Sequence, residues 1–198
     1  MKQFIGSLLF LCVPLLTAHG QDDVKGSSTV TFGLGAGRPA NSYYPGGLQL
    51  NGTYEYRLSK HWAAEFGVDT TQVKIDTFTY TYIVPAGVTI FGGLPTSYTY
   101  SYSKANALAT SMPFGFRGIM PLSQGKLELS AGGGGAYLWN PNSNGGWGWQ
   151  ATLGARLAVD KQRRFWLGTT GRYIQANSAY PSRWVVWSGD LSFRFGGR

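Results

Sequence analysis

Residues 48–58 read LQLNGTYEYRL, and apolar or aromatic side chains occupy almost every second position of this stretch. In an extended chain, Leu48, Leu50 and Tyr54 share one face, whereas Glu55 and Arg57 share the other. A period of two predicts a β-strand with two chemically different faces. The question for the whole chain is which of those faces points inward.

The same alternation recurs along the chain, and no segment after residue 20 has helical periodicity. Many of the 29 glycines interrupt stretches that could otherwise form helices. The expected strands are residues 28–37, 47–58, 61–83, 97–120, 126–139, 147–159, 165–174 and 184–195. An even number of strands leaves both ends of an antiparallel barrel on one side. We therefore predict an all-β fold, an eight-stranded antiparallel up-and-down transmembrane β-barrel.

The connections between these strands alternate in length. Short connections are expected at residues 59–60, 121–125 and 160–164, and longer ones at residues 39–46, 85–96, 140–146 and 175–183. Short turns at one rim and long loops at the other are typical of outer-membrane barrels, with turns in the periplasm and loops outside the cell.

Two observations favour a barrel with its apolar face outward. Aromatic residues gather near both ends of the strands, as interfacial girdles do. They are Tyr54, Tyr56, Trp62, Phe116, Phe165 and Phe195 toward the turns, and Trp139, Trp147, Trp149, Tyr173 and Trp187 toward the loops.

The polar face carries balanced charges, which is the second observation. Its acidic members are Glu55, Glu65, Asp69, Glu128 and Asp190, and its basic members are Arg57, Arg117, Arg156, Arg172 and Arg194. Charges in a confined lumen must pair to offset their desolvation, and the planar arginine fork suits carboxylates. We expect these ten side chains to form an ion-pair network that plugs the lumen and is weighted toward its periplasmic half.

The N-terminus has the features of a signal peptide. Residues 1–3 are a short basic start, residues 4–16 are almost entirely apolar, and small residues stand at positions 18 and 20. An apolar run of 13 residues that contains Pro14 is too short for a membrane anchor. Leu11 before Cys12 argues against a lipoprotein. We expect residues 1–20 to be removed near Gly20, and residues 21–198 to form the barrel domain.

Composition excludes several functional classes. The single cysteine, Cys12, excludes a disulfide framework, and the net charge of +8 is scattered, which argues against a nucleic-acid partner. After the signal peptide only one histidine, His61, remains, so no metal site or cofactor is expected, and a catalytic role for His61 is disfavoured. The glycines at 33–37 and 132–135 open no helix, and we interpret them as close-packing positions.

The segment of residues 76–104 continues the alternation beyond the expected membrane region. If paired residue numbers sum to 180, aromatic residues face each other across a projecting hairpin. The pairs are Phe78 with Tyr102, Tyr80 with Tyr100, and Tyr82 with Tyr98; the tip at 85–95 adds Val88, Ile90, Phe91 and Leu94. An exposed apolar tip indicates a contact surface for an extracellular protein partner. Alternatively, these aromatics extend the girdle and the tip folds against lipopolysaccharide.

Over residues 28–195 the chain resembles the small bacterial outer-membrane barrels of the OmpA and OmpX type, on strand count, loop asymmetry and alternation. The resemblance implies a non-enzymatic barrel in the outer membrane of a Gram-negative-type bacterium, surrounded by outer-membrane lipid and lipopolysaccharide, that serves envelope integrity or surface interaction. It also implies recognition of the last strand by the barrel-assembly machinery. Phe193 and Phe195 fit that pattern, although Gly196, Gly197 and Arg198 follow them. A narrow gated channel and a soluble secreted or periplasmic ligand-binding barrel remain as alternatives.

Overall fold

The computed structural model describes residues 25–40, 46–77, 81–84, 96–99, 103–140, 143–177 and 182–196. The expected signal peptide and its cleavage site lie outside these residues. The described part is almost entirely β-structure, with one short 3-10 helix, η2 (Ser123–Gly125). No helix in it is long and apolar enough to cross a membrane.

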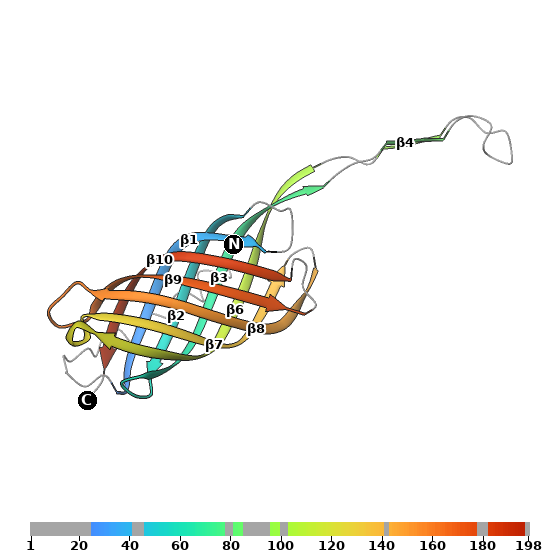
Figure 1. The fold of residues 1–198 in the computed structure, drawn as a ribbon. Coiled ribbons are helices and arrows are strands. Elements are labelled where there is room, and N and C mark those ends of the chain that lie inside the picture. Colours follow the sequence, from blue (N-terminus) through green and yellow to red (C-terminus); the bar gives the residue numbers. More distant parts are fainter. Residues whose placement is uncertain are drawn as a thin grey trace.

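Eight long strands form one closed antiparallel barrel (Figure 1). They are β1 (Ser27–Pro39), β2 (Gly47–Arg57), β3 (Trp62–Thr77), β6 (Ser103–Leu122), β7 (Leu127–Asn140), β8 (Ser143–Ala158), β9 (Phe165–Ala176) and β10 (Arg183–Gly196). Each barrel strand pairs with its neighbours in chain order, and β1 pairs with β10 to close the barrel. The predicted eight-stranded up-and-down barrel is confirmed.

A separate two-stranded ladder is formed by β4 (Thr81–Val84) and β5 (Thr96–Thr99). Paired residue numbers of β3 and β6 sum to 180, and those of β4 and β5 keep the same sum, as in the pair Tyr82 with Tyr98. The predicted register is therefore confirmed where it is described. Figure 1 places β4 beyond the end of the barrel. The pairs Phe78 with Tyr102 and Tyr80 with Tyr100, and the tip with Val88, Ile90, Phe91 and Leu94, lie outside the described residues.

The apolar face of the barrel points outward, as predicted. Leu50 and Leu153 are 57% and 67% exposed, whereas Glu55 and Arg57 are 2% and 1% exposed. In water, a belt of large exposed apolar side chains around a whole barrel would be strongly unfavourable. In a bilayer the same belt is the lipid-facing surface, and the narrow lumen is filled by side chains.

Aromatic side chains occupy both ends of this belt. Near the loops, Trp147 is 65% exposed and its ring contacts those of Tyr137 and Phe114, with centroids 5.0 and 6.2 Å apart. Near the turns, Trp62 and Phe165 are exposed as expected. Phe195 is the exception, because it is only 8% exposed and stacks on Phe193. The prediction that Phe195 offers its ring to lipid is therefore wrong.

The predicted loop at residues 140–146 is also wrong. Strand β7 continues to Asn140 and β8 begins at Ser143, with these two residues paired across a register shift near Leu138. The Asn, Ser and Gly composition indicated a loop, but the neighbouring strand gives this backbone hydrogen-bond partners and the bulge accommodates the change of register. The predicted asymmetry of the rims therefore holds only in part: the connections after β1 and β3 are long, but the β9–β10 connection at 177–182 is no longer than the β8–β9 turn at 159–164.

The expected close-packing role of the glycines is confirmed in β7. A Cβ on Gly134 would overlap the backbone of Phe114 and Gly115 on β6, and one on Gly132 would approach the backbone of Phe116. Side chains here would push β6 and β7 apart.

Candidate functional site

The lumen is where the barrel gathers its charged side chains. All ten predicted residues point into it from seven different strands, because each stands at an inward position of the two-residue alternation. Nine of them are less than 10% exposed, and the side chain of Arg156 is 12% exposed.

Glu128 is the centre of the network on the side of the short turns. Its Oε2 accepts hydrogen bonds from Arg57 Nη2 at 2.6 Å, Arg156 Nε at 2.7 Å and Arg194 Nη2 at 2.8 Å. Its Oε1 accepts a further bond from Arg194 Nη2 at 3.0 Å. One carboxylate thus joins strands β2, β7, β8 and β10, and it compensates three buried guanidinium groups at once.

Further ion pairs extend from this centre toward the middle of the barrel. Glu55 lies 2.8 Å from Arg156 Nη2 and 3.1 Å from Arg57 Nε, and its second oxygen is 3.9 Å from Arg117. Arg117 binds Glu65 at 2.6 Å.

Arg172 ends the series. Its Nη2 lies 4.0 Å from Glu65, and its Nη1 binds Asp69 at 2.5 Å. Signs alternate along the connected residues, so each charge faces opposite charges; we call these nine residues the ion chain. Its members are Glu55, Arg57, Glu65, Asp69, Arg117, Glu128, Arg156, Arg172 and Arg194.

Asp190 is the predicted member that the ion chain leaves out. Among the described residues it makes no ion pair, and instead accepts hydrogen bonds from the hydroxyls of Thr170 and Ser188. A Cβ on Gly33 would overlap Asp190 and Asn51, so this glycine gives both side chains their space. The ion chain has five arginines and four carboxylates, and Asp190 balances its remaining positive charge at a distance.

Trp166 closes the turn-side end of the lumen and was missed by the sequence analysis. It is fully buried, and the guanidinium groups of Arg194 and Arg156 lie 4.4 and 5.5 Å from the centroid of its ring. Its indole N–H donates to the backbone oxygen of Arg163 at 2.8 Å. The sequence position of Trp166 could have revealed this role, because Phe165 and Leu167 face outward and alternation then places Trp166 on the inward face.

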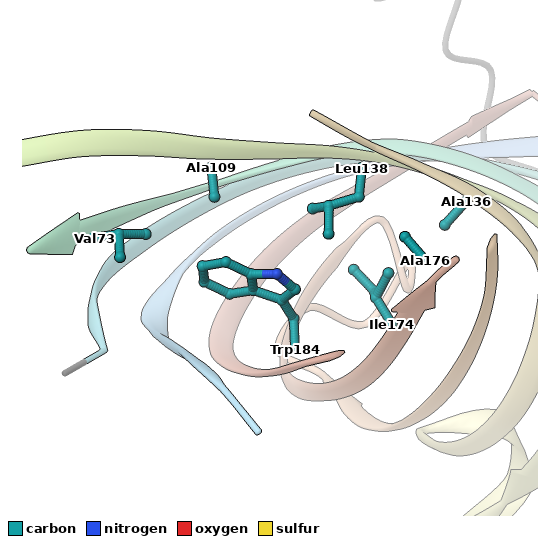
Figure 2. Packing of buried hydrophobic residues seen from close by; sticks show 7 residues of the cluster. All are labelled: Val73, Ala109, Ala136, Leu138, Ile174, Ala176 and Trp184. Carbon is teal, nitrogen blue, oxygen red and sulfur yellow. The ribbon is translucent and has the colours of Figure 1, made fainter. Parts of the chain in front are cut away.

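The loop-side half of the lumen holds a group of apolar side chains, with the buried polar residues Gln49, Thr71 and Gln150 beside them. Figure 2 shows seven buried side chains from β3, β6, β7, β9 and β10 that converge in the interior, with the Trp184 ring among them. These residues, which we call the apolar cluster, are Val73, Ala109, Ala136, Leu138, Ile174, Ala176 and Trp184. The sequence analysis placed the charges toward the half near the turns, but it did not predict that apolar side chains fill the other half.

Among the described residues, two small cavities lie between the charged side chains. The larger, of about 20 Å³, is lined by Asp190, Arg117 and Arg156 among others, and the smaller, of about 10 Å³, by Asn51, Arg172 and Asp190. A cavity of this size has room for about one water molecule. Nearby buried polar atoms without a protein partner, including Asn51 Oδ1 and Arg172 Nε, provide the bonds that such a water needs.

His61 lies at the turn rim, in the short turn that precedes β3. It is exposed, and its Nδ1 lies 3.2 Å from the backbone oxygen of Ile119. In the described part of the chain no three His, Cys, Asp or Glu side chains group in a way that could hold a metal ion.

Comparisons with solved structures support the fold. The chain is similar to the outer membrane protein OprG from Pseudomonas aeruginosa, with a TM-score of 0.63, 12% identity, and coverage of 87% of this chain and 97% of that one. It is also similar to Neisserial surface protein A, with a TM-score of 0.50, 13% identity, and coverage of 85% and 96%. No protein-family model and no curated protein sequence matches the chain. The fold is that of the small eight-stranded outer-membrane barrels.

Proposed function

We propose that this protein is a non-enzymatic outer-membrane barrel with a closed lumen, and that it acts at the cell surface through its loops. The observation that carries the proposal is the filling of the lumen by two different layers. The ion chain and Trp166 occupy the half near the turns, and the apolar cluster occupies the half near the loops.

A solute would have to displace both layers to pass. The two cavities of about 20 and 10 Å³ are too small for more than single water molecules. Opening the charged layer separates buried ion pairs, and opening the other exposes apolar side chains to water, so neither layer opens without cost. This argues against an open diffusion pore.

The charged groups of the lumen are also unsuited to catalysis. Nucleophilic hydrolysis needs a base within hydrogen-bond reach of a nucleophile and an orienting carboxylate. Four of the five lumen carboxylates bind arginines, and His61 is exposed at the turn rim against a backbone oxygen. These contacts support a structural role for the network.

The β4–β5 ladder is the feature best placed for surface interaction. Its register continues that of β3 and β6, so the same two strands that cross the membrane would carry it outward. A two-stranded ribbon has two free edges, and an edge can pair with a strand of another protein. We assign the candidate contact surface to residues 76–104, with an extracellular protein as partner and lipopolysaccharide as neighbour.

Three features support a location in the outer membrane of a Gram-negative-type bacterium: the signal-like residues 1–20, the lipid-facing belt and the interfacial aromatics. Assembly there would use the last strand, β10, in which Leu191 and Phe193 follow the outward alternation, whereas the Phe195 ring is buried. The short turns then face the periplasm.

Two measurements test the proposal. The full chain is expressed with its signal, and the outer-membrane fraction is run on a detergent gel with and without boiling. We expect a band that changes mobility on heating, whereas a soluble periplasmic protein without this shift would contradict the membrane assignment. The purified barrel is then placed in a planar bilayer. We expect no discrete conductance steps, and reproducible steps would favour the narrow channel instead.

A further inference from the structure

The charges outside the lumen are distributed unevenly. Inside it, five acidic and five basic residues cancel, so the excess positive charge of the chain lies elsewhere. Much of it lies in the three short turns, and we call this group the turn-rim basic cluster. It consists of Lys60, Lys126, Lys161, Arg163 and Arg164.

The only acidic residue in these three turns is Asp160, and its hydrogen bonds are made within its own turn. Its Oδ1 accepts the backbone N–H groups of Arg164 and Phe165, both at 2.8 Å. In the described part of the chain none of the five cluster residues makes an ion pair. Their positive charge is therefore available to a partner.

Neighbouring turns bring these charges together. The backbone oxygen of Lys126 accepts the N–H of Ala158 at 2.8 Å, which ties the β6–β7 turn to the end of β8. A Cβ on Gly125 would lie 2.9 Å from Arg163 Nη1, so the Arg163 side chain reaches the neighbouring turn. The cluster is thus a continuous basic surface along two adjacent turns, with Lys60 on the third.

The depth of the cluster matches the headgroup layer of a bilayer. Lys60 is two residues before Trp62, which is 57% exposed on the lipid face, and Arg164 directly precedes Phe165, which is 48% exposed. A strand advances about 3.3 Å per residue, so these cations lie within about 7 Å of the lipid-facing belt. The headgroup layer of a bilayer occupies about this depth.

We propose that the turn-rim basic cluster binds the phosphates of anionic phospholipids in the leaflet that faces the turns. Arginine and lysine bind phosphate oxygens by charge-assisted hydrogen bonds, and juxtamembrane cations attract anionic lipid. A zwitterionic lipid offers the same phosphate, but its own ammonium group offsets the attraction. The inference rests on the proposed function in one respect, namely that the barrel lies in a bilayer.

Lipid-dependent stabilisation of the purified barrel tests this inference. The folded protein in neutral detergent is titrated with phosphatidylglycerol or phosphatidylcholine, and the thermal unfolding midpoint is followed. A lipid that binds only the folded state raises this midpoint, so its rise with lipid concentration gives the apparent affinity. We expect phosphatidylglycerol to bind more than tenfold more tightly, and 0.5 M NaCl to weaken this preference.

The variants locate the binding surface. Lys60→Gln/Lys126→Gln/Lys161→Gln should remove most of the preference, because a cation near the membrane surface contributes up to about fivefold in affinity. The control is Arg38→Gln/Arg183→Gln, which removes two exposed arginines at the opposite rim and should keep the preference. Should the triple variant not fold, the three single variants are measured instead, and each should lose part of the preference.

Two results would overturn the inference. One is equal stabilisation of the folded wild-type barrel by both lipids, which would favour an acidic periplasmic protein as the partner of the turn-rim basic cluster. The other is a preference for phosphatidylglycerol that is as large in the triple variant as in wild type, or that disappears in the control. Failure of the proposed function looks different, because a chain that forms no heat-modifiable barrel fails before any lipid is added.

Discussion

The two halves of the lumen are closed by opposite chemistry, although the same strands build both. On the turn side, nine charged residues alternate in sign around Glu55, Glu65 and Glu128. On the loop side, most inward positions hold the aliphatic residues and Trp184 of the apolar cluster, with Gln49 and Thr71 beside them. A narrow barrel can therefore be filled by charged or by apolar side chains, but the two fillings differ in how much stability a single substitution removes.

The difference lies in directionality. Ion pairs need specific partners, and a single unpartnered charge in a desolvated site is very unfavourable, even where the intact pair contributes little net stability. Apolar packing has no fixed partners, so loss of one side chain removes its burial and leaves a cavity in proportion to its volume. We expect the charged half to be the more sensitive to single substitutions.

The largest expected effect follows replacement of Glu128 by alanine. This change leaves Arg57, Arg156 and Arg194 without their shared carboxylate, and we expect the free energy of unfolding to fall by about 3–5 kcal/mol. Urea unfolding of the reconstituted barrel measures it. Gln162→Ala, on an exposed uncharged residue of the β8–β9 turn, is the control and should have little effect. Equal midpoints for Glu128→Ala and wild type would contradict the role of the ion chain.

A somewhat smaller effect is expected in the apolar half. Leu138→Ala removes a side chain that is 2% exposed within the apolar cluster, at an expected loss of about 3 kcal/mol in the free energy of unfolding. The control is Leu153→Ala on the lipid face, where lipid tails fill the space and no cavity forms. The same unfolding titration compares the two variants. A loss for Leu153→Ala as large as that for Leu138→Ala would show that the loop-side lumen is not tightly packed.

Much of the charged half could be predicted from the sequence, because one rule governs it. Alternation assigns each residue to a face, and the inward face must have balanced charge in a narrow, desolvated lumen. The rule gives which residues enter the lumen but not their distances, since pairing depends on the height and direction of each side chain. This is why Asp190 was expected in the network and instead lies beside it, bound to two hydroxyls.

Asp190 provides a third comparison, of intermediate size. Asp190→Asn keeps an oxygen that can accept hydrogen bonds from Thr170 and Ser188 but removes the negative charge, so we expect a loss of about 1–2 kcal/mol in the free energy of unfolding. Glu128→Gln, measured in the same way, should cost clearly more because three arginines depend on that carboxylate. Similar losses for the two variants would mean that Asp190 is coupled to the ion chain as strongly as its direct members.

The apolar half and the rims were less accessible from the sequence. Val73, Leu138 and Ile174 stand at inward positions by alternation, but their apolar character alone does not tell a lumen filling from a lipid-facing residue. Likewise, the structure at residues 140–146 and the burial of the Phe195 ring depend on tertiary neighbours. A neighbouring strand supplies hydrogen-bond partners for the backbone near residue 140, and nearby side chains cover Phe195. Local composition carries no information on such neighbours.

The smallest effect on stability is expected outside the barrel altogether. Val84 pairs with Thr96, so residues 85–95 can be replaced by Asn-Gly, a two-residue turn that joins paired antiparallel strands. This variant removes the apolar tip but leaves the lumen, the girdles and the ladder register intact. We expect its heat-modifiable band to be unchanged and its free energy of unfolding to stay within about 0.5 kcal/mol of wild type.

Binding of the variant to host or neighbouring cells, compared with wild type on otherwise identical bacteria, should be lost if the tip is the contact surface. A second variant keeps the length of the segment but replaces Val88, Ile90, Phe91 and Leu94 with serine. It distinguishes the effect of the apolar side chains on binding from the effect of the segment's length. Failure of the shortened protein to assemble would place the tip among the elements that fold the barrel, and would end the distinction between a closed lumen that gives stability and a hairpin that gives function.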